Sequence, residues 1–228
     1  MSDKESDLSL RAGHRERLRQ NFLAGNLAKY ETLELLLSYA IPRRDVRPLA
    51  RMLYKRFGGM FQILSAEIED LCAVRGMGRN TAIFLKTVQK IMLDGYQDDF
   101  TDPTILHTKE QFRNYCKLLL GGKHVEEMHV LYLDEDGRLI EDQLHSTGTY
   151  DQASLYGIEV IKHAISVGAK SVILVHNHPH RETSFSTQDV EVTNELRKQL
   201  KAVNINLFDH CVVSGYMFYS MNEMKFLN

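Results

Sequence analysis

Two histidines and an aspartate in one short stretch of the chain could together bind a metal ion. Residues 171–189 read Ser-Val-Ile-Leu-Val-His-Asn-His-Pro-His-Arg-Glu-Thr-Ser-Phe-Ser-Thr-Gln-Asp. His176 and His178 are two residues apart, and Asp189 ends the stretch. Two neutral imidazoles and one carboxylate suit a catalytic zinc, which takes three protein ligands and leaves a fourth position for water. The stretch therefore predicts a zinc site with an open coordination position.

The elements that must position these side chains are a strand and a helix. The apolar run 172–175 is short, β-branched and followed by a proline-containing loop, which is typical of a buried strand. Side chains two apart on a strand point to the same face, so His176 and His178 can converge. Asp189 stands where a helix is expected to begin, with Ser186 as its N-cap. Each residue alone has an ordinary interpretation as a surface or capping residue, but the combination favours a metal site.

The same motif resembles a known family. His176-Asn177-His178-Pro179, followed by Ser186 and Asp189, is similar to the metalloprotease motif of the JAB1/MPN/Mov34 (JAMM) superfamily, and its wording resembles the bacterial RadC branch. The resemblance covers nearly the whole chain, through residues 13–19, 41–46, 130–134, 146–149 and 209–210. Two segments depart from the family pattern. His180-Arg181 replaces Ser-Gly, and residues 155–159 replace Val-His-Pro-Arg-Glu.

The resemblance implies a mixed α/β MPN domain and the hydrolysis of an amide or isopeptide bond in a peptide or protein. It places the general base at Glu127, with the neighbouring Glu126 as the alternative, because a slip of one residue reverses the face of a strand. Ser186 would then stabilise the oxyanion that forms when water attacks a carbonyl. His210 either supports the ligands from behind or is simply packed, and it is not expected to bind the metal.

The first hundred residues carry a different signal. Arg43, Arg47, Arg51 and Lys55 would form one basic stripe wherever the chain is helical. The segment Arg75-Gly76-Met77-Gly78-Arg79, between two expected helices, resembles a helix–hairpin–helix motif. The backbone N–H groups of Gly76 and Gly78 and the side chains of Arg75 and Arg79 could contact a DNA phosphate without reading sequence. A plain helical connector and a solvated charged face are the alternative interpretations.

Length and composition indicate a two-domain protein. The 228 residues carry 43% hydrophobic and 25% charged side chains and a net charge of −2, with no global basic field. The polar segment 95–107 contains Gly95 and Pro103 and is the expected boundary. We therefore predict an all-α, helix–hairpin–helix-like domain over 1–100 and an α/β domain over 108–228, with a mixed sheet flanked by helices.

The remaining expectations concern location and competing functions. Three scattered cysteines, a polar N-terminus and the lack of a long apolar run predict a cytoplasmic protein that does not enter a membrane. The family name suggests a DNA-repair or other DNA-associated process. A non-catalytic DNA-binding module with a vestigial or structural metal site is the first alternative to a zinc hydrolase. A metal-dependent nuclease is the second, although the chain lacks the carboxylate-rich set of a two-metal site.

Overall fold

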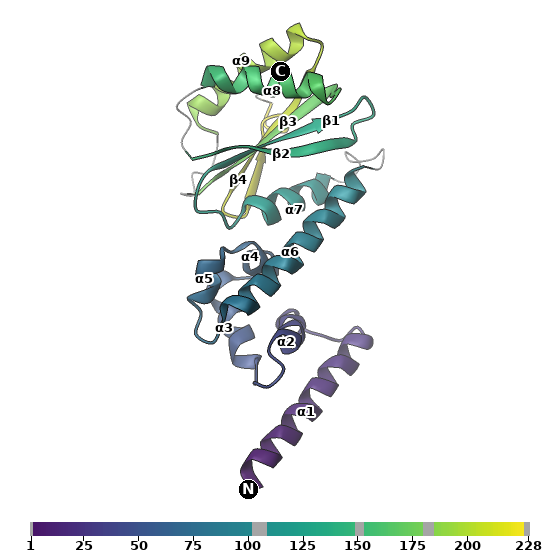
Figure 1. The fold of residues 1–228 in the computed structure, drawn as a ribbon, viewed down its shortest axis with the longest axis vertical. Coiled ribbons are helices and arrows are strands. Elements are labelled where there is room, and N and C mark those ends of the chain that lie inside the picture. Colours follow the sequence, from purple (N-terminus) through teal and green to yellow (C-terminus); the bar gives the residue numbers. More distant parts are fainter. Residues whose placement is uncertain (1, 102–108, 149–152, 180–184, 226–228) are drawn as a thin grey trace. The chain divides into compact units, whose positions relative to one another are not determined.

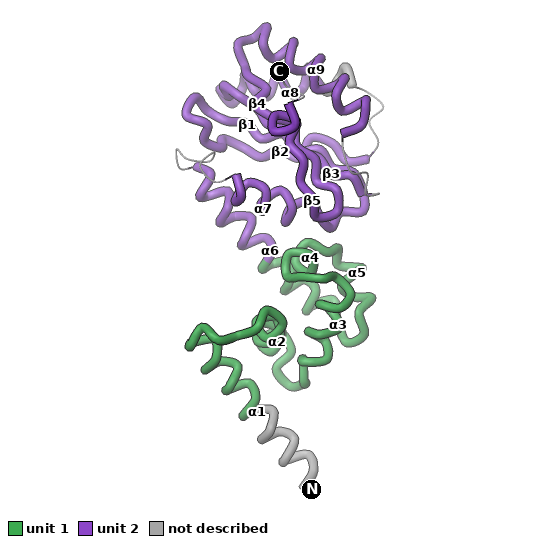
Figure 2. Tube along the Cα trace, turned by 180° about the vertical axis from the view of Figure 1, so that it is seen from behind, with its two compact units in different colours: residues 1–88 green, residues 89–228 purple. Residues whose placement is uncertain are grey.

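The computed structural model describes residues 2–101, 109–148, 153–179 and 185–225 of the chain, with the side chains of residues 2–12 and 153–156 left out. The chain divides into two compact units, residues 1–88 and 89–228 (Figure 2).

The first unit is helical, as expected. It contains α1 (Ser2–Leu23), α2 (Lys29–Ala40), α3 (Arg47–Phe57), α4 (Met60–Ser65), α5 (Ile68–Cys72) and the first half of α6 (Arg79–Phe100). Its core contains Leu33, Leu37 and Leu53, which are fully buried. The α2–α3 connection is held by Arg15, whose guanidinium donates to the backbone carbonyls of Ile41, Pro42 and Arg44.

The division between the units falls inside α6, not in the expected boundary segment 95–107. Helix α6 continues through Gly95 to Phe100, because its last turns pack on α7 (Lys109–Leu120). Phe100 is buried and its ring lies edge-on to that of Tyr115, 5.4 Å away between centroids. Burial of two aromatic rings outweighs the weak helix-breaking tendency of one glycine. The rest of the expected boundary, residues 102–108, lies outside the described residues.

The second unit is α/β and is built on a five-stranded mixed sheet with helices on both faces. Its other elements are β1 (Glu127–Leu133), β2 (Leu139–Thr147), α8 (Ala153–Ser166), β3 (Ser171–His178), α9 (Thr187–Ala202), β4 (Asn206–Ser214) and β5 (Met217–Ser220). The strand order is β2-β1-β3-β4-β5. Strands β3 and β4 pair in parallel and are joined through α9, while the other described neighbours are antiparallel. Figure 1 shows α8 and α9 on one face of the sheet and α7 on the other.

Strand alternation assigns each sheet residue to one of these faces. The main core of the second unit lies between the sheet and helices α8 and α9, and the strand residues in it have even numbers in β1 and β3: Met128, Val130, Tyr132, Val172 and Leu174. Odd-numbered residues of β1 face α7 instead. A hairpin at Asp136-Gly137 joins β1 to β2, with Gly137 at a φ of 80°.

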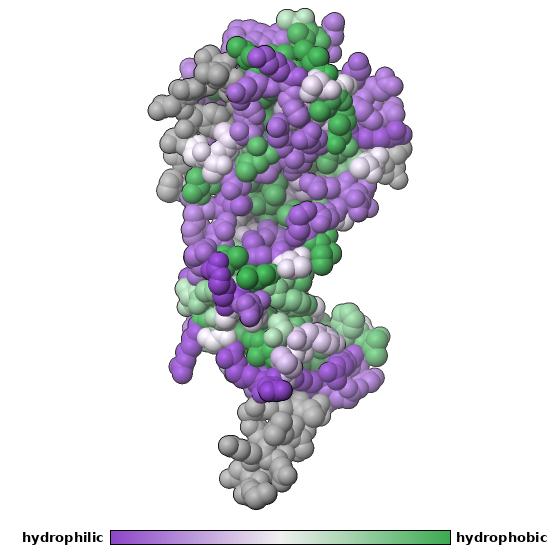
Figure 3. Space-filling model, in the orientation of Figure 1, coloured by the Kyte–Doolittle hydropathy of each residue, from purple (hydrophilic) through white to green (hydrophobic). Residues whose placement is uncertain are grey.

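Most of the large hydrophobic side chains among the described residues are buried or half-buried. On the face drawn in Figure 3, hydrophobic residues lie in separate patches among hydrophilic ones. Among the described residues, no helix combines the length and the apolar character needed to cross a bilayer.

Candidate metal centre

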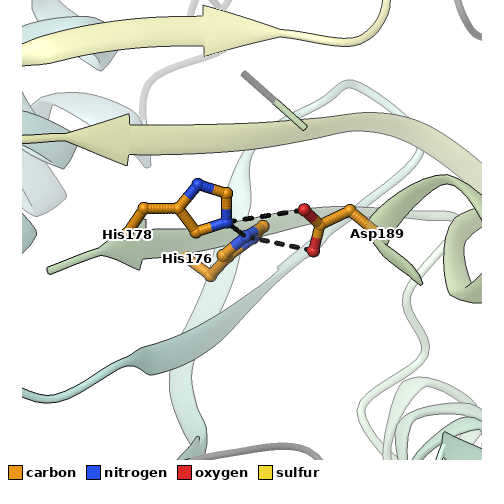
Figure 4. Close-up of side chains that lie close together, drawn as sticks. All are labelled: His176, His178 and Asp189. Carbon is orange, nitrogen blue, oxygen red and sulfur yellow. Dashed lines mark hydrogen bonds and ion pairs between the residues drawn. The ribbon is translucent and has the colours of Figure 1, made fainter. Parts of the chain in front are cut away.

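The structure brings the three predicted ligands together at the end of β3 (Figure 4). His176 and His178 point from β3 to the face that α9 covers, and Asp189 reaches them from the first turn of α9. The Nε2 atoms of the two histidines are 2.9 Å apart. The Asp189 carboxylate oxygens lie 3.2 Å from Nε2 of His176 and 3.4 Å from Nε2 of His178.

The donor set fits a zinc ion. In a tetrahedral site with bonds near 2.0 Å, neighbouring ligand atoms are separated by ~3.3 Å, which is close to the three distances observed here. The His176 side chain is wholly buried, whereas 10% of the His178 side chain and 13% of the Asp189 side chain are exposed. The site is therefore closed to solvent around His176 and accessible to solvent beside His178 and Asp189. Three protein ligands with one accessible side are typical of catalytic rather than structural zinc.

The Asp189 carboxylate is held in its ionised form. Burial alone would raise its pKa, but the nearby His176 and His178 side chains and the hydrogen bond from Ser186 outweigh burial and hold this pKa well below the usual range. A ligand carboxylate must be ionised to bind a cation, so the surroundings of Asp189 favour metal binding.

Ser186 caps the helix that carries Asp189. Its Oγ accepts a hydrogen bond from the Asp189 backbone N–H at 3.1 Å and donates to the Asp189 carboxylate at 2.8 Å. The same carboxylate accepts from the Ser186 backbone N–H at 2.7 Å, which completes a capping box. The capping interpretation of Ser186 is thus present in the structure. Its role toward an oxyanion stays a prediction, because it requires the hydroxyl hydrogen to leave Asp189.

The structure does not bring Glu127, the predicted general base, to the three ligands. Met128 lies opposite His176 in the β1–β3 ladder, so these two side chains share a face. Glu127 precedes Met128 and therefore points to the other face, where its carboxylate pairs with Lys123 at 3.0 Å and lies 3.8 Å from Nε2 of His129. The pKa of Glu127 is lowered by these contacts, first by His129.

The alternative base, Glu126, is one residue earlier and falls on the ligand face. The ladder continues to it, since the Gly148 backbone N–H donates to the Glu126 carbonyl at 2.8 Å. Alternation then places Glu126 on the side of Met128, next to the end of β3. Its side chain is half-buried, so it is accessible to water.

Asn177, between the two histidines, fastens this part of β1 to β3. It is 2% exposed and belongs to the face opposite the ligands. Its Oδ1 accepts from the Glu127 backbone N–H at 2.8 Å, and its Nδ2 donates to the Val125 carbonyl at 3.1 Å. One amide therefore holds the backbone on both sides of Glu126. The sequence motif contains this asparagine, but its partners could not be inferred without the strand register.

A buried polar network occupies the opposite face of β1. Nδ1 of His129 lies 2.7 Å from the Asp142 carboxylate, which also accepts from the Tyr115 hydroxyl. Burial lowers the pKa of His129, but the hydrogen bond with Asp142 and the negative charge of the nearby Glu127 outweigh it and raise this pKa to about 9. Glu127 belongs to this network, which gives it a structural role on the face away from the metal site.

Two further residues, which sequence reasoning did not assign to the site, lie behind it. His210 of β4 is 1% exposed, and its Nε2 lies 2.9 Å from Nδ1 of His176. Thr193 of α9 is 1% exposed and contacts Nδ1 of His210 through Oγ1. Burial lowers the pKa of His210 well below its ordinary value. The Asp209-His210 pair was noticeable in the sequence, whereas Thr193 carries no signal by itself.

The predicted phosphate-contacting hairpin in the first unit has the expected backbone. Residues 73–78 connect α5 to α6, and Gly76 adopts a φ of 94°, a conformation that favours glycine. Met77 is buried, and the flanking Gly76, Gly78, Arg75 and Arg79 are exposed. The start of α6 is therefore presented to solvent with two arginines beside it, while its contact with DNA stays a prediction.

Comparison with known proteins agrees with these features. A family model described as a RadC-like JAB domain matches residues 106–226. A UPF0758 protein of Fusobacterium nucleatum is 33% identical over 98% of both chains, and a UPF0758 protein of Ruegeria pomeroyi is 34% identical over 94% of this chain and 97% of its own. With a mixed sheet, a JAB-type domain and relatives aligned over nearly its full length, this chain belongs to the RadC family.

Proposed function

We propose that this protein is a zinc-dependent hydrolase that cleaves an amide or isopeptide bond in a peptide or protein. The observation that carries the proposal is the convergence of His176, His178 and Asp189 on one solvent-accessible point. A zinc ion bound there would polarise a carbonyl group and lower the pKa of a water molecule. Membership of a JAB-domain family supports this class of chemistry.

The protein's own residues would supply the remaining parts of such a reaction. Asp189 stays ionised and orients its oxygens toward both histidines. We assign the general base to Glu126, because strand alternation directs Glu127 to the opposite face. The Glu126 carboxylate would take a proton from the attacking water and return it to the leaving nitrogen. Asn177 would hold Glu126 in place through its backbone contacts with both neighbours.

A substrate screen tests this proposal. Mixtures of peptides and of lysine-linked isopeptides would be incubated with zinc-loaded protein and followed by mass spectrometry. We expect wild type to cleave a subset of bonds and His178→Ala to cleave none of them. His163→Ala is the matched control, because His163 pairs with Glu141 on α8 and β2, outside the ligand set. Zinc-loaded wild type that leaves every bond intact, or His178→Ala that remains fully active, would contradict the proposal.

A second candidate function is sequence-independent DNA binding by the first unit. The observation that favours it is the exposed α5–α6 hairpin, where Gly76 and Gly78 leave the backbone accessible beside Arg75 and Arg79. N–H groups in the first turn of a helix have no partner within the helix and suit a phosphate oxygen. This function is compatible with hydrolysis by the second unit, and it can be tested separately.

A further inference from the structure

A chain of buried hydrogen bonds runs from the metal ligand His176 to the helix that carries Asp189. Nδ1 of His176 meets Nε2 of His210 at 2.9 Å. Nδ1 of His210 meets the Thr193 hydroxyl, which also donates to the backbone carbonyl of Asp189. The three residues that form these bonds, His176, His210 and Thr193, are at least 99% buried, so water does not compete for the contacts.

Counting hydrogens gives this chain a direction. A carbonyl oxygen can only accept, so the single hydrogen of the Thr193 hydroxyl is directed to Asp189. Toward His210 the hydroxyl then offers only lone pairs, and Nδ1 of His210 must carry the hydrogen that joins them.

The ring nitrogens follow from this direction. A buried imidazole that is neutral has one ring hydrogen, so Nε2 of His210 is bare and accepts from Nδ1–H of His176. His176 consequently has a bare Nε2. That atom is the one that faces His178 and Asp189.

We propose that Thr193 and His210 are positioning residues that hold His176 in the tautomer able to bind zinc. The inference rests on the proposed function, from which it takes zinc as the ion that these residues would bind. Metal-binding histidines usually have their second ring nitrogen fixed by a hydrogen-bond partner, and loss of such a partner weakens metal binding ~10–100-fold. Here the partner is itself a histidine, whose own tautomer is set by a threonine.

Thr193 has a second effect on the site. Its hydroxyl ties the backbone of Asp189, in the first turn of α9, to the ring of His210 in β4. Two of the three ligands, His176 and Asp189, are thus connected through one side chain. Replacing this hydroxyl is expected to disturb both of them without changing any ligand.

The first test measures the tautomer directly in the full chain without metal. Long-range ¹H–¹⁵N NMR distinguishes Nδ1–H from Nε2–H imidazoles. We expect His176 and His210 both to be in the Nδ1–H form in wild type. A His176 ring in the Nε2–H form would overturn the inference, because the chain of hydrogen bonds would then run in the opposite direction.

The second test measures zinc affinity by competition with a chromophoric chelator. Thr193→Val removes the hydroxyl at similar volume, and we expect ~10–100-fold weaker binding. Thr193→Ser keeps the hydroxyl and should bind within about threefold of wild type. Thr87→Val is the matched control, since Thr87 makes the same bond to the carbonyl four residues earlier in α6 but does not contact the site.

Variants of His210 keep the test decisive if Thr193→Val does not fold. His210→Gln retains a side-chain acceptor for Nδ1–H of His176 and should preserve most of the affinity. His210→Leu removes the acceptor and should lose it ~10–100-fold. Equal affinity of the Gln and Leu variants would overturn the inference.

These outcomes are separable from those that bear on the proposed function. A wild-type protein that binds no zinc contradicts the hydrolase, while the NMR measurement on metal-free protein still decides the tautomer of His176. Wild type that binds zinc only as tightly as Thr193→Val and His210→Leu keeps the hydrolase and removes the positioning role.

Discussion

Met128 of β1 lies directly opposite His176 of β3. This pairing decides which of two adjacent glutamates lies on the face of the candidate metal site. Side chains opposite each other in an antiparallel ladder share a face, and neighbours along a strand alternate. Glu127 is therefore directed toward Lys123 and His129, and Glu126 toward the ligands.

Substitution of the two glutamates should have very different effects on hydrolysis. Glu126→Gln removes the carboxylate that takes the proton, and we expect kcat to fall ~10²–10⁴-fold with zinc content unchanged. Glu127→Gln weakens contacts on the other face, so kcat should stay within a few fold of wild type. The measurement is turnover of the substrate found by the screen, with zinc quantified in each preparation. The reverse order of effects would contradict the assignment of Glu126 as the base.

Asn177 should matter for stability as well as for activity. Asn177→Ala removes the partner of two backbone groups in partly buried bonds, the Glu127 N–H and the Val125 carbonyl. An unsatisfied buried polar group costs ~1–3 kcal/mol, and water can replace part of these two bonds, so the free energy of unfolding should fall by about 1 kcal/mol or more. Urea unfolding measures this change, and the exposed Asn80, replaced by Ala, serves as the control. Equal stabilities of the two variants would mean that the Asn177 bonds contribute nothing.

The sequence was sufficient to predict that His176, His178 and Asp189 lie close together, because the signal is local. Alternation along residues 171–178 and a capped helix start near Ser186 fix the faces of these three side chains with no knowledge of the rest of the fold. The helical character of the first part of the chain and the α/β character of the second follow from equally local patterns.

Features that depend on long-range packing could not be predicted in this way. The face of Glu126 depends on pairing with β3, about fifty residues later in the chain. Thr193 meets His210 because α9 crosses over between the parallel strands β3 and β4. The end of α6 was expected to be a linker, since its glycine and its aspartates are typical of one, but aromatic packing of Phe100 on Tyr115 keeps it helical.

The His129–Asp142 pair predicts a pH dependence of stability. The pKa of His129 in the folded protein is raised to about 9 from an ordinary value of 6.5. The contribution of protonated His129 to the free energy of unfolding is therefore complete below pH 6.5 and is lost as the pH rises through 9. A shift of this size corresponds to roughly 3 kcal/mol.

Comparison with His129→Gln isolates this contribution. Metal-free wild type and variant would be unfolded with urea at about pH 6 and about pH 9.5, on either side of the window in which His129 titrates. We expect wild type to lose about 3 kcal/mol more than the variant between the two pH values. A constant difference between the two proteins would show that His129 does not change its protonation on unfolding.

Contacts of the α5–α6 hairpin with DNA phosphates predict a salt-dependent effect. Each phosphate contact contributes about −0.9 to the slope of log K against log salt concentration, so Arg75→Ala with Arg79→Ala should reduce the slope by about 2. The measurement is fluorescence anisotropy of a labelled duplex of random sequence with the full chain. The salt concentration is varied from roughly 50 to 200 mM, the range in which phosphate contacts change the affinity strongly.

A charge-matched variant shows whether the effect is local to the hairpin. Lys162→Ala with Lys198→Ala removes the same charge from exposed positions of α8 and α9. This variant should retain the wild-type slope. Absence of DNA binding by wild type at the lowest salt concentration would remove the second candidate function altogether.

Metal content tests the central claim most directly. Wild type, His178→Ala and His163→Ala would be purified without chelator and analysed for zinc and for protein concentration. We expect about one zinc per chain in wild type and in His163→Ala, and almost none in His178→Ala, because two remaining ligands hold zinc poorly. Wild type without bound zinc, or His178→Ala with as much zinc as wild type, would contradict the assignment of His176, His178 and Asp189 as a metal centre.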